Sequence, residues 1–430
     1  MTRQLSVQRT TIEGRRVLEN RLLDVRRLSH ELAAPLSAED MTVQAMEDAS
    51  PTKWHLAHVT WFFETFILAK HLPHYRPFDD TFNYCFNSYY ESQGPRQPRP
   101  QRGVLTRPSS ERVMAYRAHV DEGLAKFFAL GVEPKSEIAR LIEVGINHEQ
   151  QHQELLLTDI LALFAANPLR PAYRNPRPRA AAREPSAPGW IDYPGGIRQA
   201  GHGGEGFAWD NEAPRHDVLI HPFRLADRLV TNGEWLAFME DSGYRTASLW
   251  LADGWATVNR DEWNAPLYWE QRDRQWFAMS LEGLQPVDRA APVAHVSYFE
   301  ADAFARWAGK RLPTEFEWEI AAQDLPVTGN SLATKALRPL PAEQDPGGRP
   351  RQMFGDVWEW TQSAYLPYPG YRPLAGALGE YNGKFMVSQQ VLRGGSCATP
   401  PGHTRATYRN FFYPQQRWQF MGLRLASEIN

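Results

Sequence analysis

Two histidines of this chain have the spacing of a metal site. His148 and His152 stand four residues apart in a long apolar stretch. Side chains so spaced lie one above the other on one face of a helix, where both imidazoles can bind one metal ion. A third imidazole is available about ninety residues upstream, from His55 or His58. Three imidazoles leave coordination positions open for reactants, as catalytic sites require. The pattern therefore predicts an enzyme with a metal centre.

The short motif leaves two questions open. Neither spacing nor periodicity separates His55 from His58 as the third ligand. The segment also matches the His-Glu-x-x-His signature of zinc peptidases, in which Glu149 would act as general base on a zinc-bound water. In the alternative, Glu149 points elsewhere and Gln151 faces the ligand pocket.

Helices are needed to hold these histidines. Apolar residues at helical spacing predict helices over residues 11–35 and 51–70, a third beginning at Ser109 and a fourth from Ser136 to about residue 166. Ser50 is the expected N-cap of the second helix, and residues 74–108 read as a long ordered loop. Four such helices predict a bundle, whose core is a common place for metal sites.

The composition changes after this helical region. Residues 171–188 are rich in Pro, Arg and Ala and are predicted to be an interdomain linker. Beyond them, strand-like segments at 216–223, 391–393 and 422–426 and helical stretches near 231–241 and 299–309 alternate with turns. Because 430 residues exceed what one core usually organises, we expect an α+β protein. Its helical domain would span residues 1–170 and an irregular α+β domain residues 189–430.

Charge and composition exclude some classes of protein. A net charge of −3 lacks the basic footprint of a nucleic-acid binder. No apolar run approaches the roughly 18 residues of a membrane span, and no signal-peptide core follows the N-terminus. The two cysteines, Cys85 and Cys397, fit a reducing compartment. We therefore expect a cytoplasmic protein that binds neither nucleic acid nor membrane.

Longer motifs carry a family resemblance. The segment from Trp54 to Phe66, with its Trp-His-Leu-Ala-His start, and residues 148–154 resemble the DinB-like domain of the ergothioneine sulfoxide synthases, the EgtB family. Four segments in the second half resemble that family's formylglycine-generating-enzyme-like domain, a C-type-lectin-related fold: residues 310–319, 354–360, 392–396 and 422–426. The resemblance covers nearly the whole chain, in the right order.

The resemblance implies a non-haem Fe(II) enzyme with small-molecule substrates. Such enzymes join the sulfur of cysteine or γ-glutamylcysteine to C2 of the hercynine imidazole, consume O2 and give a sulfoxide, which a separate pyridoxal-phosphate-dependent lyase cleaves. His58 matches one iron ligand because the family pattern ends in Leu-Ala-His, and His148 and His152 match the other two. Gln151 matches a residue that helps to hold the betaine substrate.

A polar loop before the third helix contains two adjacent tyrosines, Tyr89 and Tyr90. One branch of the family brings such a pair to the iron, where a phenol can donate a proton or a hydrogen atom. The resemblance thus implies a catalytic role without separating the two, and surface packing is the alternative. Arg96, Arg99 and Arg102 could pair with a substrate carboxylate, and we favour Arg99.

The C-terminal region bears on the sulfur donor. In the γ-glutamylcysteine-using branch, an aspartate and an arginine occupy the positions of Phe412 and Gln416. Both charges are missing here, which favours free cysteine. Asn410 matches a polar contact to hercynine, and Phe411 an aromatic that can face the trimethylammonium group by a cation–π contact. Apolar packing is the alternative for both phenylalanines.

Other functions remain open at this point. They are a selenoneine- or ovothiol-type homologue, a zinc-dependent DinB-type thiol transferase, and a non-catalytic, lectin-like ligand-binding protein.

Overall fold

The computed structural model describes residues 2–133, 136–178, 187–343, 348–374, 379 and 382–429, without the side chains of residues 2–13 and 15. The chain divides into two compact units, Met1–Pro168 and Leu169–Asn430, and each is considered by itself. The predicted linker includes residues 179–186, which lie outside the described residues. Arg174, in the first part of the predicted linker, forms an ion pair with Glu282 at 2.8 Å. This part of the linker therefore belongs to the second unit.

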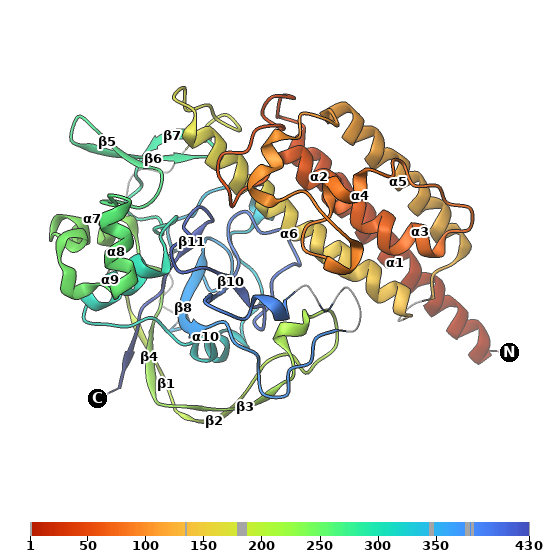
Figure 1. Cartoon of the computed structure of the whole chain (residues 1–430). Helices are drawn as coiled ribbons and strands as arrows, with labels where there is room; N and C mark the ends of the chain where they lie inside the picture. Colours follow the sequence, from red (N-terminus) through yellow and green to blue (C-terminus); the bar gives the residue numbers. More distant parts are fainter. Residues whose placement is uncertain are drawn as a thin grey trace. The chain divides into compact units, whose positions relative to one another are not determined.

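The first unit is a helical bundle, as the sequence predicts. Its long helices are α1 (Thr2–Ala33), α2 (Thr52–Phe63), α5 (Ser110–Leu130) and α6 (Glu137–Ala166). α2 packs against both α5 and α6, and α1 packs against α6 (Figure 1). Ser109 and Ser136, at which the sequence predicts that the third and fourth helices begin, are the N-caps of α5 and α6, because each accepts a hydrogen bond from a backbone amide three residues on.

The segment after α2 is more structured than the predicted loop. It contains a π-helical turn, two short α-helices and two 3-10 turns: Glu64–Leu68, α3 (Ala69–His71), α4 (Phe82–Phe86), Glu91–Gln93 and Arg99–Val104. Glu64 anchors this segment, since its carboxylate accepts hydrogen bonds from the hydroxyls of Tyr75 at 2.8 Å and Tyr116 at 2.6 Å.

The start of α2 differs from the prediction. Pro51 occupies the N-cap position, and no side chain caps this end. Ser50 is engaged elsewhere: its hydroxyl accepts from Arg102 at 2.9 Å, and its amide donates to Asp159 at 2.8 Å. The start of α2 is therefore tied to α6 and to the loop rather than capped by its own serine.

A glycine allows α2 and α6 to approach closely. A Cβ atom at Gly145 of α6 would lie 2.6 Å from Cε1 of Phe63 and 2.9 Å from Cε1 of Phe62, distances far shorter than a van der Waals contact. Gly145 precedes His148 by one turn, so the close approach brings the histidines of α6 next to the side chains of α2.

The second unit is an α+β domain, in agreement with the expected fold class. One sheet has the order β1-β4-β12 and another the order β10-β9-β8-β11. The strands of these sheets are β1 (Trp190–Tyr193), β4 (Phe223–Ala226), β8 (Trp358–Ala364), β9 (Gln390–Arg393), β10 (Asn410–Phe412), β11 (Met421–Gly422) and β12 (Ala426–Glu428). Two smaller sheets pair β2 (Gly196–Ala200) with β3 (His216–Ile220), and β5 (Trp269–Arg272), β6 (Gln275–Ser280) and β7 (Gly283–Pro286).

Four short helices complete this unit in the part of the chain that is described: α7 (Asn232–Glu240), α8 (Ala252–Arg260), α9 (Tyr298–Trp307) and α10 (Glu315–Ala322). α7 and α9 match the predicted helical stretches. The predicted strand at 216–223 is wrong as one element, because the chain turns at His221-Pro222. β3 pairs with β2, whereas β4 pairs with β1 and β12.

Helix α10 connects the core of the second unit to β10. Trp318 is fully buried in an apolar cluster with Phe223. On the same helix, Glu315 binds Arg409 at 2.8 Å and Arg393 at 2.8 Å. These ion pairs are buried, so the strand that begins directly after Arg409 is held in a fixed position.

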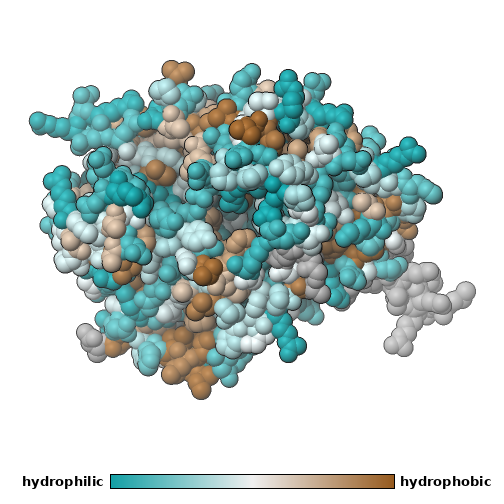
Figure 2. Space-filling model, viewed as in Figure 1, coloured by the Kyte–Doolittle hydropathy of each residue, from teal (hydrophilic) through white to brown (hydrophobic). Residues whose placement is uncertain are grey.

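Apolar side chains also occur at the surface of the second unit. Ile197 and Leu219 are directly opposite each other on β2 and β3, and both are about 70% exposed. Figure 2 shows a hydrophobic patch over this two-stranded sheet. Such a cross-strand pair stabilises a sheet that has no third strand. Within the described residues, no helix has the length and apolar character that crossing a membrane requires.

Candidate metal centre

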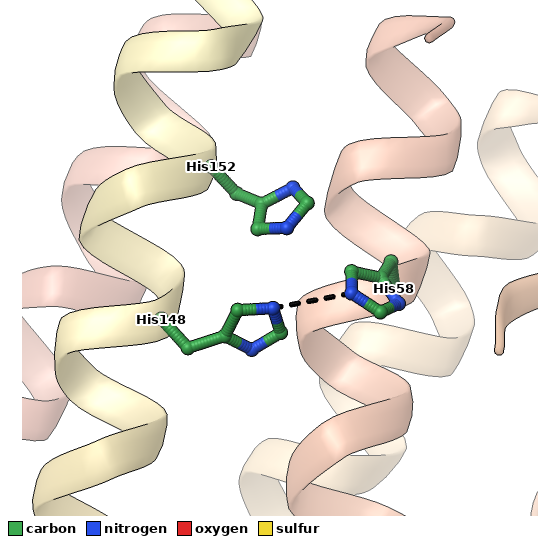
Figure 3. A group of neighbouring side chains, drawn as sticks. All are labelled: His58, His148 and His152. Carbon is green, nitrogen blue, oxygen red and sulfur yellow. Dashed lines mark hydrogen bonds between the residues drawn. The ribbon is translucent and has the colours of Figure 1, made fainter. Parts of the chain in front are cut away.

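Three histidines of the bundle converge on one point. His58 of α2 and His148 and His152 of α6 each offer a ring nitrogen, and these three nitrogens lie within 4.8 Å of one another (Figure 3). The Nε2 atoms of His58 and His148 are 3.1 Å apart. Two nitrogens bound at right angles to a metal, each at about 2.1 Å, would be about 3 Å apart. The spacing therefore suits two ligands of one ion.

The orientation of His58 is fixed by its surroundings. Its Nδ1 lies 2.6 Å from the carbonyl oxygen of Phe86. A carbonyl only accepts, so Nδ1 carries the proton and Nε2 presents its lone pair toward His148. The ring lies nearly parallel to two indoles, Trp54 at 4.6 Å and Trp61 at 5.7 Å between centroids. His58 is thus presented as a neutral ligand with one possible donor atom.

Burial keeps all three rings neutral. It lowers the pKa of His58 well below the ordinary value, and the neighbouring His148 lowers it further. Burial likewise brings the pKa of His148 to about 3 and lowers that of His152, with a smaller effect from the two other rings. Metals bind the neutral imidazole, so the cluster is ready to accept an ion at neutral pH.

His55 lies next to this cluster but is not part of it. Its Nδ1 is 2.9 Å from Nδ1 of His152, and its Nε2 is 3.0 Å from Oδ2 of Asp159. His55 is therefore positioned to contact the candidate metal ligand His152, whereas His58 is positioned to bind the metal itself. This separates two residues that spacing leaves equivalent.

Glu149 does not face the cluster, which argues against the zinc-peptidase alternative. Its carboxylate accepts hydrogen bonds from Ser29 at 2.6 Å, Arg117 at 2.9 Å and Arg26 at 3.1 Å. Burial alone would raise the pKa of Glu149, but the two guanidinium charges and the serine outweigh burial and lower it to about 2. The carboxylate connects α6 to α1 and α5 and is not available as a general base.

The other predicted residues of the first unit differ in burial and in their contacts. Gln151 is half-buried on α6, one position before His152. Tyr90 is fully buried, and its ring packs against Trp61 at 5.6 Å. Tyr89 is half-buried, with its ring 5.0 Å from that of Tyr90. The Trp61 ring thus contacts both Tyr90 and His58, at 5.6 Å and 5.7 Å between centroids.

Of the three candidate arginines, the structure brings Arg102 rather than Arg99 toward the histidines. Arg99 is exposed. Arg102 is 2% exposed, and its guanidinium lies 3.4 Å from the centre of the Trp54 ring. Burial lowers the pKa of Arg102, and its charge in turn contributes to lowering the pKa of His58 and His152. Sequence spacing gave no means of choosing between the two arginines.

The predicted substrate residues of the second unit lie on and after β10. Asn410 is half-buried, and its Oδ1 accepts from the amide of Phe411 at 3.0 Å. The Phe411 ring stacks on Tyr365 with centroids 4.0 Å apart. Phe412 meets Trp418 edge to face at 5.4 Å. Gln416 accepts a hydrogen bond from the amide of Tyr413 at 3.0 Å.

The donor set fits a catalytic metal. Three neutral imidazoles are a common ligand set for iron, zinc, copper or nickel, and they leave positions open for reactants. The nitrogen donors support a metal-dependent enzyme and do not by themselves select iron. Sequence reasoning missed the link from His152 through His55 to Asp159. The pattern that could have indicated this link is the position of Asp159, which follows His152 by seven residues and so lies on the same helix face.

Comparisons with known proteins place both units. Residues 21–156 match the family model of the DinB superfamily. Residues 175–335 and 349–429 match the sulfatase-modifying factor enzyme 1-like domain. The first match contains all three histidines of the cluster, and the second contains β10.

Relatives with known names match most of the chain. The hercynine oxygenase of Mycobacterium tuberculosis is 34% identical, over 88% of this chain and 91% of that protein. The hercynine oxygenase of Mycolicibacterium thermoresistibile is 31% identical, over 97% of this chain and 96% of that protein. The formylglycine-generating enzyme of Streptomyces coelicolor is 31% identical, over 55% of this chain and 86% of that protein.

Proposed function

The chain belongs to the hercynine oxygenase family, and on this premise we propose that it is an Fe(II)-dependent sulfoxide synthase that uses free cysteine. Members of the family are oxygen-dependent oxidoreductases of ergothioneine biosynthesis. The observation that carries the proposal is the cluster of His58, His148 and His152, three neutral rings within reach of one ion.

The proposed reaction balances with O2 as the oxidant. The C2–H bond of hercynine and the S–H bond of cysteine break, and a C–S bond and a sulfoxide S–O bond form. The second oxygen atom leaves as water. Ferrous iron, when bound, supplies the one-electron chemistry that lets O2 react with these closed-shell substrates. A separate pyridoxal-phosphate-dependent lyase would then cleave the product.

Residues of the first unit are suited to hold the substrates. We assign Gln151 to hercynine. We propose that Arg102, rather than Arg99, binds the cysteine carboxylate. Arg102 is buried, and its Nε atom is without a hydrogen-bond partner among the described residues. A guanidinium with a spare N–H suits a carboxylate.

Residues of the second unit support free cysteine over the longer donor. Phe412 and Gln416 carry no charge, and both are engaged within the protein, with Trp418 and with the backbone of Tyr413. The amino and carboxylate ends of a γ-glutamyl group would therefore lack charged partners at these positions. We keep Asn410 and Phe411 as proposed contacts to hercynine.

We also propose a cytoplasmic location, because both cysteines are free thiols.

A turnover assay tests the proposal. The protein is loaded with Fe(II) without oxygen and mixed with hercynine and either cysteine, γ-glutamylcysteine or a selenosugar, after which O2 is admitted. We expect O2 consumption and the product mass of the cysteine sulfoxide, with a lower kcat/KM for γ-glutamylcysteine. A selenium-containing product as the preferred outcome, or activity with zinc in place of iron, would overturn the proposal.

The tyrosine pair gives a second expected result. Tyr90 is fully buried between the rings of Trp61 and Phe66, whereas Tyr89 is half-buried and so can be reached by a substrate. We therefore assign the proton-donating phenol to Tyr89 and a packing role to Tyr90. Tyr89→Phe is expected to lower kcat about 100-fold with an unchanged iron content, and Tyr90→Phe only a few-fold. The reverse order, measured by steady-state O2 consumption, would assign the chemistry to Tyr90.

A further inference from the structure

A chain of three polar groups, two of them buried, runs along the contact between α2 and α6. His152 and Asp159 lie on one face of α6, and His55 of α2 stands between them. The two ring Nδ1 atoms of His55 and His152 are 2.9 Å apart, and the other ring nitrogen of His55 is 3.0 Å from the Asp159 carboxylate. His55 is 3% and Asp159 6% exposed.

The direction of these hydrogen bonds follows from which groups can donate. A carboxylate only accepts, so Nε2 of His55 carries a proton and donates it to Asp159. A neutral His55 then has only a lone pair at Nδ1. The proton between the two rings must therefore sit on Nδ1 of His152, which leaves Nε2 of His152 with its lone pair for a metal.

From this geometry we propose that His55 and Asp159 are positioning residues for the metal ligand His152. Together they fix its tautomer and its ring orientation, as a carboxylate often does directly for a metal-bound histidine. Here a second imidazole stands between the carboxylate and the ligand. The inference rests on the proposed function only in requiring a metal at the cluster.

The backbone holds the carboxylate of Asp159 in place. Its Oδ2 accepts a second hydrogen bond from the amide of Ser50 at 2.8 Å, just before α2 begins. His58 shows the same arrangement in a simpler form, since its Nδ1 donates to the carbonyl of Phe86. Two of the three ligands are thus oriented through the nitrogen that faces away from the cluster.

Metal affinity tests this inference without turnover. Co(II) is titrated into the metal-free protein, and its visible absorption reports both affinity and geometry. His55→Leu removes the acceptor and is expected to weaken Co(II) binding about 10- to 100-fold and to alter the absorption bands. In His55→Gln the amide oxygen can accept from His152 and the amide N–H can donate to Asp159, so this variant should regain most of the affinity.

A matched control separates this effect from the loss of a histidine in general. His119 is half-buried in the same bundle, and its Nε2 lies 3.0 Å from a backbone carbonyl. His119→Leu is expected to bind Co(II) like the wild type. Asp159→Asn keeps an acceptor oxygen but loses the charge, and we expect a loss of about 3- to 10-fold.

The outcomes distinguish an error in the metal centre from an error in the positioning role of His55 and Asp159. If the wild-type protein and His148→Ala bind Co(II) equally, the metal centre and the proposed function are both wrong. If His148→Ala loses the metal but His55→Leu binds within two-fold of the wild type, only the positioning role is wrong. If His55→Leu does not fold, Asp159→Asn decides, and wild-type affinity in that variant overturns the inference.

Discussion

His148→Ala is expected to lose the bound metal and, with it, all measurable oxygen consumption. His148 is completely buried at the centre of the cluster, 3.1 Å from the donor atom of His58. Its removal leaves two imidazoles of the cluster, His58 and His152. Since outer partners of a ligand already affect metal affinity 10- to 100-fold, loss of the ligand itself should weaken binding by more than 100-fold. Iron content after reconstitution and O2 uptake with hercynine and cysteine measure the two effects.

The control for this experiment is His71→Ala. His71 is an exposed histidine of the same unit, on α3, and its removal should change neither iron content nor O2 uptake. Circular dichroism establishes that His148→Ala still folds, which we expect because a metal-free bundle retains its apolar contacts. Full iron content in folded His148→Ala would contradict the cluster as the metal site.

The local features of the first unit could be predicted from sequence because they depend on near neighbours. Ser109 and Ser136 cap the helices that follow them, since a cap needs only an amide three residues away. The His148–His152 pair is likewise set by helix geometry alone. The two-domain α+β architecture followed from the change in composition and from the family resemblance.

Features that depend on a partner element could not be predicted in the same way. His55 and His58 lie one turn apart on α2, and only the position of α6 decides which one meets His148. The strands of the second unit are short and pair over long distances, as when β12 joins β4 some 200 residues earlier. Their pairing is fixed by tertiary contacts, such as the Glu315–Arg409 ion pair, that no local pattern reveals.

Glu149 is the residue for which the short motif and the structure differ most, and its replacement gives the second large expected effect. Glu149→Gln removes the charge between Arg26 and Arg117, both of which are buried. An uncompensated buried charge costs about 3–5 kcal/mol of stability. We expect the free energy of unfolding of the bundle to fall by about that amount, measured by urea titration. A peptidase-like general base would instead show lost turnover at unchanged stability.

The matched control and the pH dependence make this test specific. Glu143→Gln, on the same helix, breaks a partly exposed ion pair with Arg21 and should cost at most about 1 kcal/mol of stability.

The pKa of Glu149 is lowered to about 2, against about 4.3 in an unfolded chain. The ionised carboxylate therefore stabilises the fold fully above about pH 4.3, and this contribution is lost as the pH falls toward 2. The gap between wild type and Glu149→Gln should narrow over that range, because protonation gives the wild type the same neutral side chain. A gap that stays constant with pH would show that the stabilisation comes from packing at residue 149 and not from its charge.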